Sequence, residues 1–211
     1  MKERLLARPV LDVVAGPPYL SHEIHPRAFT PRQCERIVAA GLSFEADRAL
    51  LEGDGGTSVD DEGIRSATTA WLPPTEEHWW VYEKLAAVVE RANRRYGFEL
   101  WGFGEDLQFT TYAAPGDFYS WHQDGLDGNL SGRKLSVVVQ LTDPASYEGG
   151  ELQLFDVTED AGREELDLFA SATSALGTAV VFPAFEYHRV LPMRSGLRHS
   201  LVAWVSGPPF R

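Results

Sequence analysis

A histidine and a carboxylate that could bind one metal ion stand two residues apart in the segment Trp121-His122-Gln123-Asp124. In an extended segment both side chains point to the same face, because side chains alternate along a strand. Such a pair is common by chance, so it indicates a metal site only when a third ligand is present. His188, at the start of a predicted strand, is the natural choice. Two imidazoles and one carboxylate form the facial triad of non-haem iron sites, which leaves metal positions open for other ligands.

Arg198 follows His188 by ten residues and shares a strand face with Ser200. A guanidinium that points into a protein interior is costly unless an anion pairs with it. A carboxylate ligand suits this position, since the planar guanidinium can bind it through two hydrogen bonds, and the Ser200 hydroxyl adds a donor. The alternative is a surface arginine that pairs with a nearby glutamate.

The second half of the chain carries the elements that must position these groups. Strands are predicted over residues 107–112, 134–142, 151–155, 178–183, 188–193 and 198–205, which are rich in β-branched and aromatic side chains. Polar side chains share one face in three of them: Gln108, Thr110 and Tyr112; Ser136 and Gln140; Arg198 and Ser200. These polar faces favour a barrel or jelly roll that encloses a site. Alternatively, they point to solvent.

The first half of the chain predicts two helices joined by an acidic segment. The first helix starts after Thr30, which acts as N-cap and forms a capping box with Gln33. The second runs from near Thr75 to Gly97, with apolar residues at spacings of three and four. Between them, the glycine-rich residues 52–63 predict a loop that could close over the site as a lid.

Length and composition predict one domain over residues 1–211, in which residues 1–100 support a β core formed by residues 101–211. A hydrophobic fraction of 44% excludes global disorder, and a net charge of −12 disfavours nucleic acid and anionic membranes as partners. Cys34 is the only cysteine, which excludes an internal disulfide and a thiolate zinc site. Without a predicted signal peptide or membrane span, we expect a cytoplasmic protein. The sequence favours no particular oligomeric state.

Five sequence blocks follow one another in the second half of the chain. They are Y-x6-Y-x-x-H-x-D (112–124), R-x-L-S (133–136), Y-E-G-G-E-L (147–152), G-T-A-V-V-F-P with its following histidine (177–188) and G-x-R-x-S-L-x-x-W (196–204). In this order they resemble the prolyl-4-hydroxylase-like branch of the iron(II)- and 2-oxoglutarate-dependent oxygenases, in its small bacterial form. The resemblance covers about residues 107–204.

The resemblance implies a mainly β fold with flanking helices. The expected fold is a double-stranded β-helix, a cupin-like jelly-roll barrel with the N-terminal helices packed on one sheet. It also implies Fe(2+) bound by His122, Asp124 and His188. The co-substrates would be 2-oxoglutarate and O2, with ascorbate as a candidate reductant.

The same resemblance implies a binding site for 2-oxoglutarate. Arg198 would bind its distal carboxylate, and Ser200, Tyr112 and Gln140 would complete the co-substrate pocket. Relatives often have a tyrosine where this chain has Gln140, whose amide can still donate a hydrogen bond.

The implied reaction hydroxylates an unactivated C–H bond, releases succinate and CO2, and needs no side chain as acid or base. The carboxylate of Asp124 favours hydroxylation, since related halogenases have a small residue there. The expected substrate is a small molecule, an amino acid or a peptidyl residue, with a residue of a protein substrate as the alternative. Gln108, Arg65 and Trp204 are the candidate substrate-facing residues. The competing class is a cupin-like metal-binding barrel without oxygenase activity, which usually has more histidine ligands and needs no inward arginine.

Overall fold

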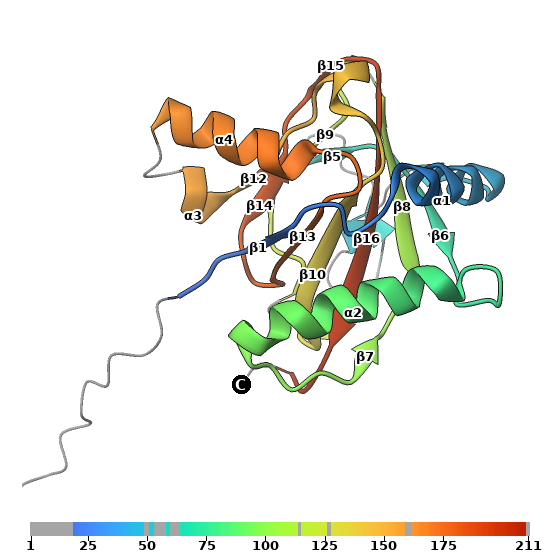
Figure 1. Ribbon diagram of the computed structural model, residues 1–211, viewed down its shortest axis with the longest axis vertical. Helices are drawn as coiled ribbons and strands as arrows, with labels where there is room; N and C mark the ends of the chain where they lie inside the picture. Colours follow the sequence, from blue (N-terminus) through green and yellow to red (C-terminus); the bar gives the residue numbers. More distant parts are fainter. Residues whose placement is uncertain are drawn as a thin grey trace, which may run out of the picture.

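The computed structural model describes residues 19–48, 51–52, 58–59, 64–113, 115–125, 128–158 and 162–209. These residues form a large and a small β-sheet, and two helices cover one face of the large sheet (Figure 1). This is a jelly-roll-type arrangement, so the expected fold class is confirmed. The strands that the structure describes form open sheets and do not close into a barrel.

The large sheet consists of eight strands. Their order is β1 (Glu23–His25), β13 (Ala179–Pro183), β10 (Arg133–Gln140), β16 (Leu197–Ser206), β8 (Leu107–Ala113), β6 (Thr68–Leu72) and β2 (Asp47–Arg48), with β7 (Gly102–Phe103) also paired to β16. Every pair is antiparallel. The predicted strands over residues 107–112, 134–142, 178–183 and 198–205 thus lie in one sheet.

The small sheet has four strands, in the order β12 (Leu152–Leu154), β14 (His188–Val190), β9 (Phe118–His122) and β5 (Arg65–Ser66). Two short pairs accompany it: β11 (Glu148–Gly149) with β15 (Met193–Ser195), and β3 (Leu51–Glu52) with β4 (Ser58–Val59). Strands β1, β5 and β6 come from the first hundred residues, so this half of the chain contributes to both sheets. The predicted lid over residues 52–63 falls largely outside the described residues.

Helix α1 (Pro31–Ser43) begins as the sequence predicts. The Thr30 hydroxyl accepts a hydrogen bond from the Gln33 backbone, and the Gln33 side chain accepts one from the Thr30 backbone. Helix α2 (Trp79–Tyr96) starts later than predicted, because the Thr75 carbonyl accepts hydrogen bonds from His78 and Trp79 in a turn. It ends at Gly97, whose φ of 70° lies in the left-handed region that glycine adopts readily.

The remaining helical segments lie in the second half of the chain. They are η1 (Gly128–Leu130), η2 (Pro144–Ser146), α3 (Phe155–Thr158) and α4 (Arg163–Ser174). The sequence prediction of strands and turns alone was incomplete here, because α4 buries only Phe169 and Thr173 and lies at the edge of the small sheet (Figure 1). No helix among the described residues is long and apolar enough to cross a membrane.

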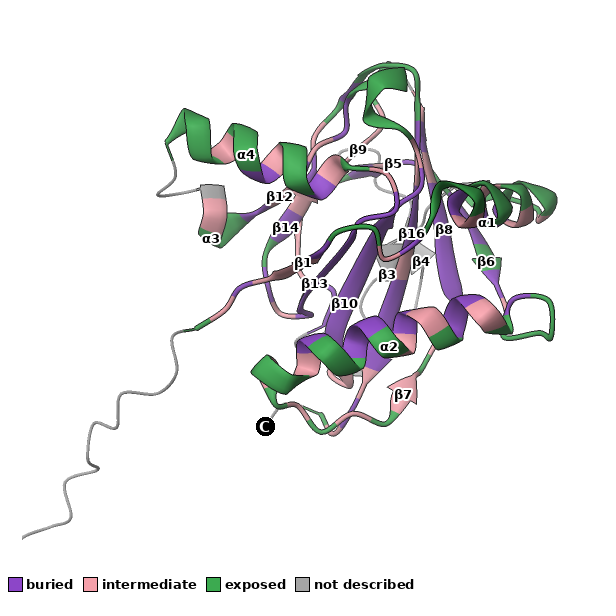
Figure 2. Ribbon diagram, viewed as in Figure 1, coloured by how far each residue is buried: buried purple, intermediate pink, exposed green. Residues whose placement is uncertain are grey.

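The main hydrophobic core lies between the large sheet and helices α1 and α2. Alternate residues of the central strands face it, among them Leu107, Leu135, Val137, Leu201 and Ala203. They meet buried side chains of the two helices, such as Ile37 and Leu85, and Figure 2 shows the buried strands beneath the helices. The opposite sheet face carries the intervening residues, which point toward the small sheet.

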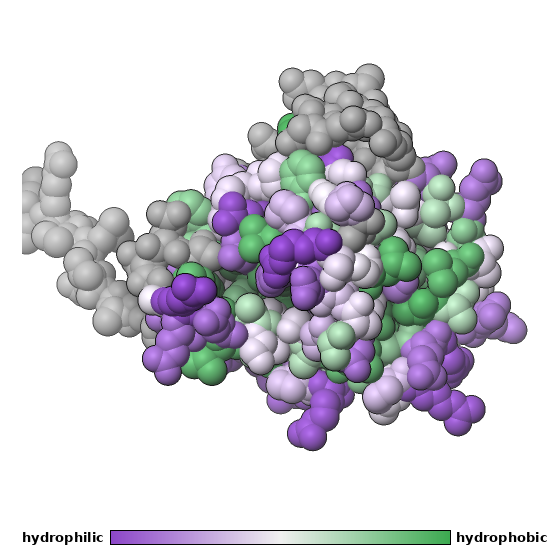
Figure 3. Space-filling model, turned by 90° about the horizontal axis from the view of Figure 1, so that it is seen from above, coloured by the Kyte–Doolittle hydropathy of each residue, from purple (hydrophilic) through white to green (hydrophobic). Residues whose placement is uncertain are grey.

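One face of the molecule carries both hydrophilic and hydrophobic side chains (Figure 3). Hydrophilic side chains project around the rim of the face shown in Figure 3, and hydrophobic side chains gather in smaller groups between them.

Candidate metal centre and co-substrate cavity

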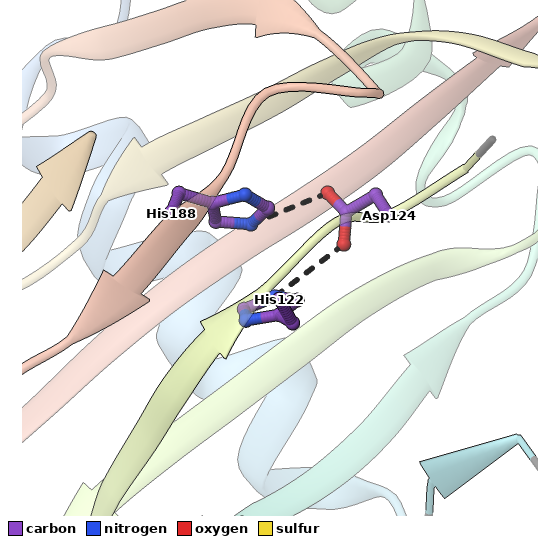
Figure 4. Close-up of side chains that lie close together, drawn as sticks. All are labelled: His122, Asp124 and His188. Carbon is purple, nitrogen blue, oxygen red and sulfur yellow. Dashed lines mark ion pairs between the residues drawn. The ribbon is translucent and has the colours of Figure 1, made fainter. Parts of the chain in front are cut away.

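The three predicted metal ligands lie together at one end of the small sheet (Figure 4). His122 ends β9, Asp124 follows it, and His188 begins β14 directly opposite His122 in the strand register. Asp124 Oδ1 lies 3.6 Å from His122 Nε2, and Asp124 Oδ2 lies 3.5 Å from His188 Nε2. Metal bonds to such atoms are about 2.0–2.2 Å long, so two ligands of one ion lie up to about 4.4 Å apart. The cluster therefore fits a single metal ion.

Backbone carbonyls orient both imidazole rings. His122 Nδ1 lies 2.8 Å from the Ser120 carbonyl oxygen, and His188 Nδ1 lies 2.9 Å from that of Glu186. A carbonyl can only accept, so Nδ1 carries the proton in each ring. The lone pair of each Nε2 is then directed at the centre of the cluster, as a metal ligand requires.

Asp124 is held from three sides. The Ser136 hydroxyl donates a hydrogen bond of 2.6 Å to Asp124 Oδ2. The Asp124 backbone donates to the Ala184 carbonyl, and Arg133 donates to the Asp124 carbonyl, both at 2.9 Å. Since Ser136 lies on the large sheet, this contact fixes the carboxylate between the two sheets.

Electrostatics keep the ligands in their metal-binding protonation states. Burial alone would raise the pKa of Asp124, but the two histidines and the Ser136 hydrogen bond hold it well below its usual value. Burial, together with the neighbouring His122, lowers the pKa of His188 to about 4. The cluster thus offers a carboxylate and a neutral His188 imidazole near pH 7.

A cavity of about 720 Å³ opens next to this cluster, and Arg198 lines it. Arg198 is only 1% exposed, and its Nη2 donates a hydrogen bond of 2.8 Å to Gln140 Oε1. Its Nη1 has no hydrogen-bond partner, and no described carboxylate forms an ion pair with it. The alternative of a surface arginine paired with a glutamate is therefore wrong.

The other predicted site residues lie around the same cavity. Tyr112 and Ser200 line it beside Arg198, whose Cζ lies 5.2 Å from the Tyr112 ring centroid. Gln140 is connected to the cavity through the hydrogen bond that it accepts from Arg198. The candidate substrate-facing residues Gln108, Arg65 and Trp204 also line the cavity.

Three further residues of the site had no role assigned from the sequence. Tyr119 stacks on the His122 ring with a centroid distance of 3.4 Å. Arg133 lies over the Trp204 ring at 3.8 Å and donates to Glu105 at 2.7 Å. Tyr119 and Arg133 belong to the five sequence blocks, and this membership could have indicated from the sequence that they lie in the site. The pairing of Arg133 with Glu105 depends on the tertiary fold.

Known proteins resemble this chain in sequence and in fold. Residues 107–206 match the model of the 2OG-Fe(II) oxygenase superfamily. A PKHD-type hydroxylase of Picosynechococcus sp. is 35% identical over 181 residues, which cover 85% of this chain and 75% of that protein. A PKHD-type hydroxylase of Synechococcus sp. (strain CC9902) is 36% identical over 90 residues, but the match spans 43% of this chain and only 36% of that protein.

Solved structures show the same fold at low sequence identity. A Pseudomonas putida prolyl-4-hydroxylase aligns with a TM-score of 0.65 and 21% identity, covering 89% of this chain and 93% of its own. A second similar structure is that of a Trichoplax adhaerens prolyl hydroxylase in complex with a hypoxia inducible factor oxygen degradation domain peptide fragment. It aligns with a TM-score of 0.68 and 17% identity, covering 88% of this chain and 83% of its own. The chain belongs to the 2OG-Fe(II) oxygenase superfamily, in its prolyl-4-hydroxylase-like branch. The expected Fe(2+), 2-oxoglutarate and O2 are the cofactor and co-substrates of this superfamily.

Proposed function

We propose that this protein is an iron(II)- and 2-oxoglutarate-dependent dioxygenase that hydroxylates an unactivated C–H bond and releases succinate and CO2. One observation carries the proposal. The three-ligand cluster and the buried Arg198 guanidinium, which forms no ion pair with a described carboxylate, share one cavity. A metal-binding barrel without oxygenase activity needs the cluster but has no use for this cation.

His122, Asp124 and His188 are the proposed iron ligands. The bound iron would supply the activation of dioxygen, which side chains cannot perform. The protein's part is to hold the ligands rigidly. The carbonyls of Ser120 and Glu186 fix the two imidazoles, and Ser136 fixes the carboxylate.

Arg198 is the proposed partner of the distal carboxylate of 2-oxoglutarate. Its free Nη1 is a donor without a protein acceptor, and Gln140 restrains the guanidinium through Nη2. Because Gln140 accepts with Oε1, its amide nitrogen remains available to donate to the same carboxylate. The hydroxyls of Ser200 and Tyr112 complete this polar end of the cavity.

The substrate end of the cavity is assigned to Gln108, Trp204 and Arg65. The Trp204 Nε1 group is buried without a hydrogen-bond partner and can donate to a substrate. We expect a small molecule, an amino acid or a peptidyl residue as substrate, acted on in the cytoplasm. A residue of a protein substrate is the second candidate, since the structurally similar Trichoplax adhaerens prolyl hydroxylase is in complex with a peptide fragment.

The direct test is anaerobic titration of the protein with Fe(II) and 2-oxoglutarate. The wild type should develop a weak visible charge-transfer band, which requires both ligands on one metal. Asp124→Ala should abolish the band, whereas Asp167→Ala, an exposed carboxylate on α4, should retain it. A wild-type protein without a band would refute the proposed function.

A further inference from the structure

We propose that Arg65 forms a second anion-binding site in this cavity, and that the substrate carries a carboxylate which pairs with it. The inference rests on the proposed function and narrows its substrate to carboxylic acids. It starts from a second buried cation that the metal centre and the co-substrate do not use.

Arg65 lies on β5 of the small sheet, whereas Arg198 lies on β16 of the large sheet, and both line the cavity. It is 8% exposed and lines the cavity, and its buried Nε has no hydrogen-bond partner. Its Cζ lies 4.6 Å from the Tyr119 ring centroid. This cation–π contact engages the flat face of the guanidinium and does not occupy the buried Nε–H, which lies in the plane of the group.

The described carboxylates around Arg65 either have other partners or are exposed to solvent. Asp117 accepts from the Ser66 hydroxyl with Oδ1 at 2.6 Å and from the Ala113 backbone with Oδ2 at 2.7 Å. Asp124 belongs to the metal cluster, and Glu105 pairs with Arg133. Asp47 is exposed at the rim. Within the described part of the chain, no carboxylate forms an ion pair with Arg65.

Among the described residues, the other buried charges of the loaded cavity pair with one another and not with Arg65. A ferrous dication and a 2-oxoglutarate dianion cancel, and the charges of Arg198 and Asp124 cancel. Arg133 and Glu105 form a pair of their own. Asp47, the other carboxylate of the lining, is exposed at the rim, so Arg65 is the buried cation with which no described carboxylate forms an ion pair. A buried charge of this kind is costly unless a ligand compensates it.

The position of Arg65 also suits a substrate rather than the co-substrate. Arg65 contacts Tyr119, and Tyr119 stacks on the metal-ligand ring of His122. A carboxylate bound to Arg65 would therefore lie on the small-sheet side of the metal centre. Carbon atoms close to that carboxylate would then be held near the metal.

Acetate serves as a probe that needs no knowledge of the substrate. Wild type, Arg65→Met and Arg65→Lys are loaded with Mn(II) and N-oxalylglycine, a stable analogue of 2-oxoglutarate. Their thermal unfolding is compared in sodium acetate and in sodium chloride at equal ionic strength. Acetate should raise the wild-type Tm by about 2–4 °C over chloride. Arg65→Lys should keep most of this rise and Arg65→Met should lose it, and an equal rise in all three proteins would overturn the inference.

A second measurement identifies the source of the carboxylate. Free L-amino acids and short peptides with a free C-terminus are compared with their carboxamides as stimulators of 2-oxoglutarate consumption. Stimulation should be confined to the free acids, and the responding class distinguishes an amino-acid substrate from a peptide. Carboxamides that stimulate as well as the acids would also overturn the inference.

Failure of this inference is distinguishable from failure of the proposed function. N-oxalylglycine should raise the Tm of the Mn(II)-loaded wild type, and this rise should be lost in Arg198→Met. If that result holds while the acetate response does not depend on Arg65, only the assignment of Arg65 fails. If N-oxalylglycine does not stabilise the wild type, the proposed function fails as well.

Discussion

The two faces of the large sheet differ sharply although they are built from the same strands. On β16, Leu201 and Ala203 pack against the helices, whereas their neighbours Ser200 and Val202 face the cavity. On β10, Val137 lies in the core while Ser136 holds the Asp124 carboxylate. The helix-side face buries apolar groups, and the cavity-side face buries donors that lack partners.

The helix-side face of the large sheet therefore mainly stabilises the fold, and the cavity-side face mainly binds ligands. Apolar contacts on the helix side hold the strands rigidly, so that some polar groups on the other side keep their positions although they lack hydrogen-bond partners. Unsatisfied buried polar groups cost stability and persist where a ligand uses them. Substitutions on the two faces should therefore change different measured quantities.

Truncation on the helix side should give the largest effect. Leu201→Ala removes a fully buried side chain, and we expect a loss of about 2–5 kcal/mol in the free energy of unfolding. Denaturant unfolding measures this loss. Leu197→Ala, on the same strand but 51% exposed, is the control and should cost far less. Metal binding by the folded fraction of Leu201→Ala should be retained, and its loss would contradict the separation of the two faces.

Arg198→Gln on the cavity side should change ligand affinity instead of stability. We expect the affinity for 2-oxoglutarate to fall about 100-fold, or roughly 3 kcal/mol, because a buried charge partner is lost. The free energy of unfolding should stay equal or rise, since an unpaired buried charge is removed. Calorimetric titration of the metal-loaded protein measures the affinity. Arg194→Gln, an exposed arginine on β15, should bind like wild type.

Acid should destabilise the metal-free protein through His188. In the unfolded chain this imidazole binds a proton below its ordinary pKa of 6.5, but in the folded protein only near pH 4. Stability should therefore fall as the pH drops from about 6.5 to 4, by about 3 kcal/mol for this group. Unfolding with a chelator present should show this slope in wild type and a shallower one in His188→Gln. Parallel pH profiles of the two proteins would rule out this role of His188.

Ser136→Ala should have the smallest effect of these substitutions. Loss of the hydroxyl leaves Asp124 in place but frees its carboxylate to rotate. We expect metal affinity to fall about 10- to 100-fold, as is typical when a supporting partner of a metal ligand is removed. Competition with a metal chelator measures it. Ser171→Ala, an exposed serine on α4, is the matched control, and equal affinities of the two variants would contradict the role of Ser136.

Much of this architecture could be predicted from local patterns. Alternation of polar and apolar residues predicted which sides of β8, β10 and β16 face the cavity, because side-chain direction follows from strand geometry alone. The capping box at Thr30 predicted the start of α1 because all its contacts lie within three residues.

Features that depend on contacts between distant parts of the chain could not be predicted from the sequence as readily. The pairing of β1 with β13 joins segments far apart in the chain, and nothing local in Glu23–His25 signals it. Helix α4 carries a weak apolar face and was missed. Arg65 was predicted to face the substrate, but its burial without an ion pair to any described carboxylate depends on the tertiary fold, including the pairing of β5 with β9.

The crystal structure of the protein with Mn(II) and N-oxalylglycine tests the central claim most directly. The proposal predicts one metal ion bonded to His122 Nε2, Asp124 and His188 Nε2 at about 2.0–2.3 Å, with the distal carboxylate of N-oxalylglycine on Arg198. A metal ion bound elsewhere, or a ligand whose distal carboxylate does not reach Arg198, would contradict it.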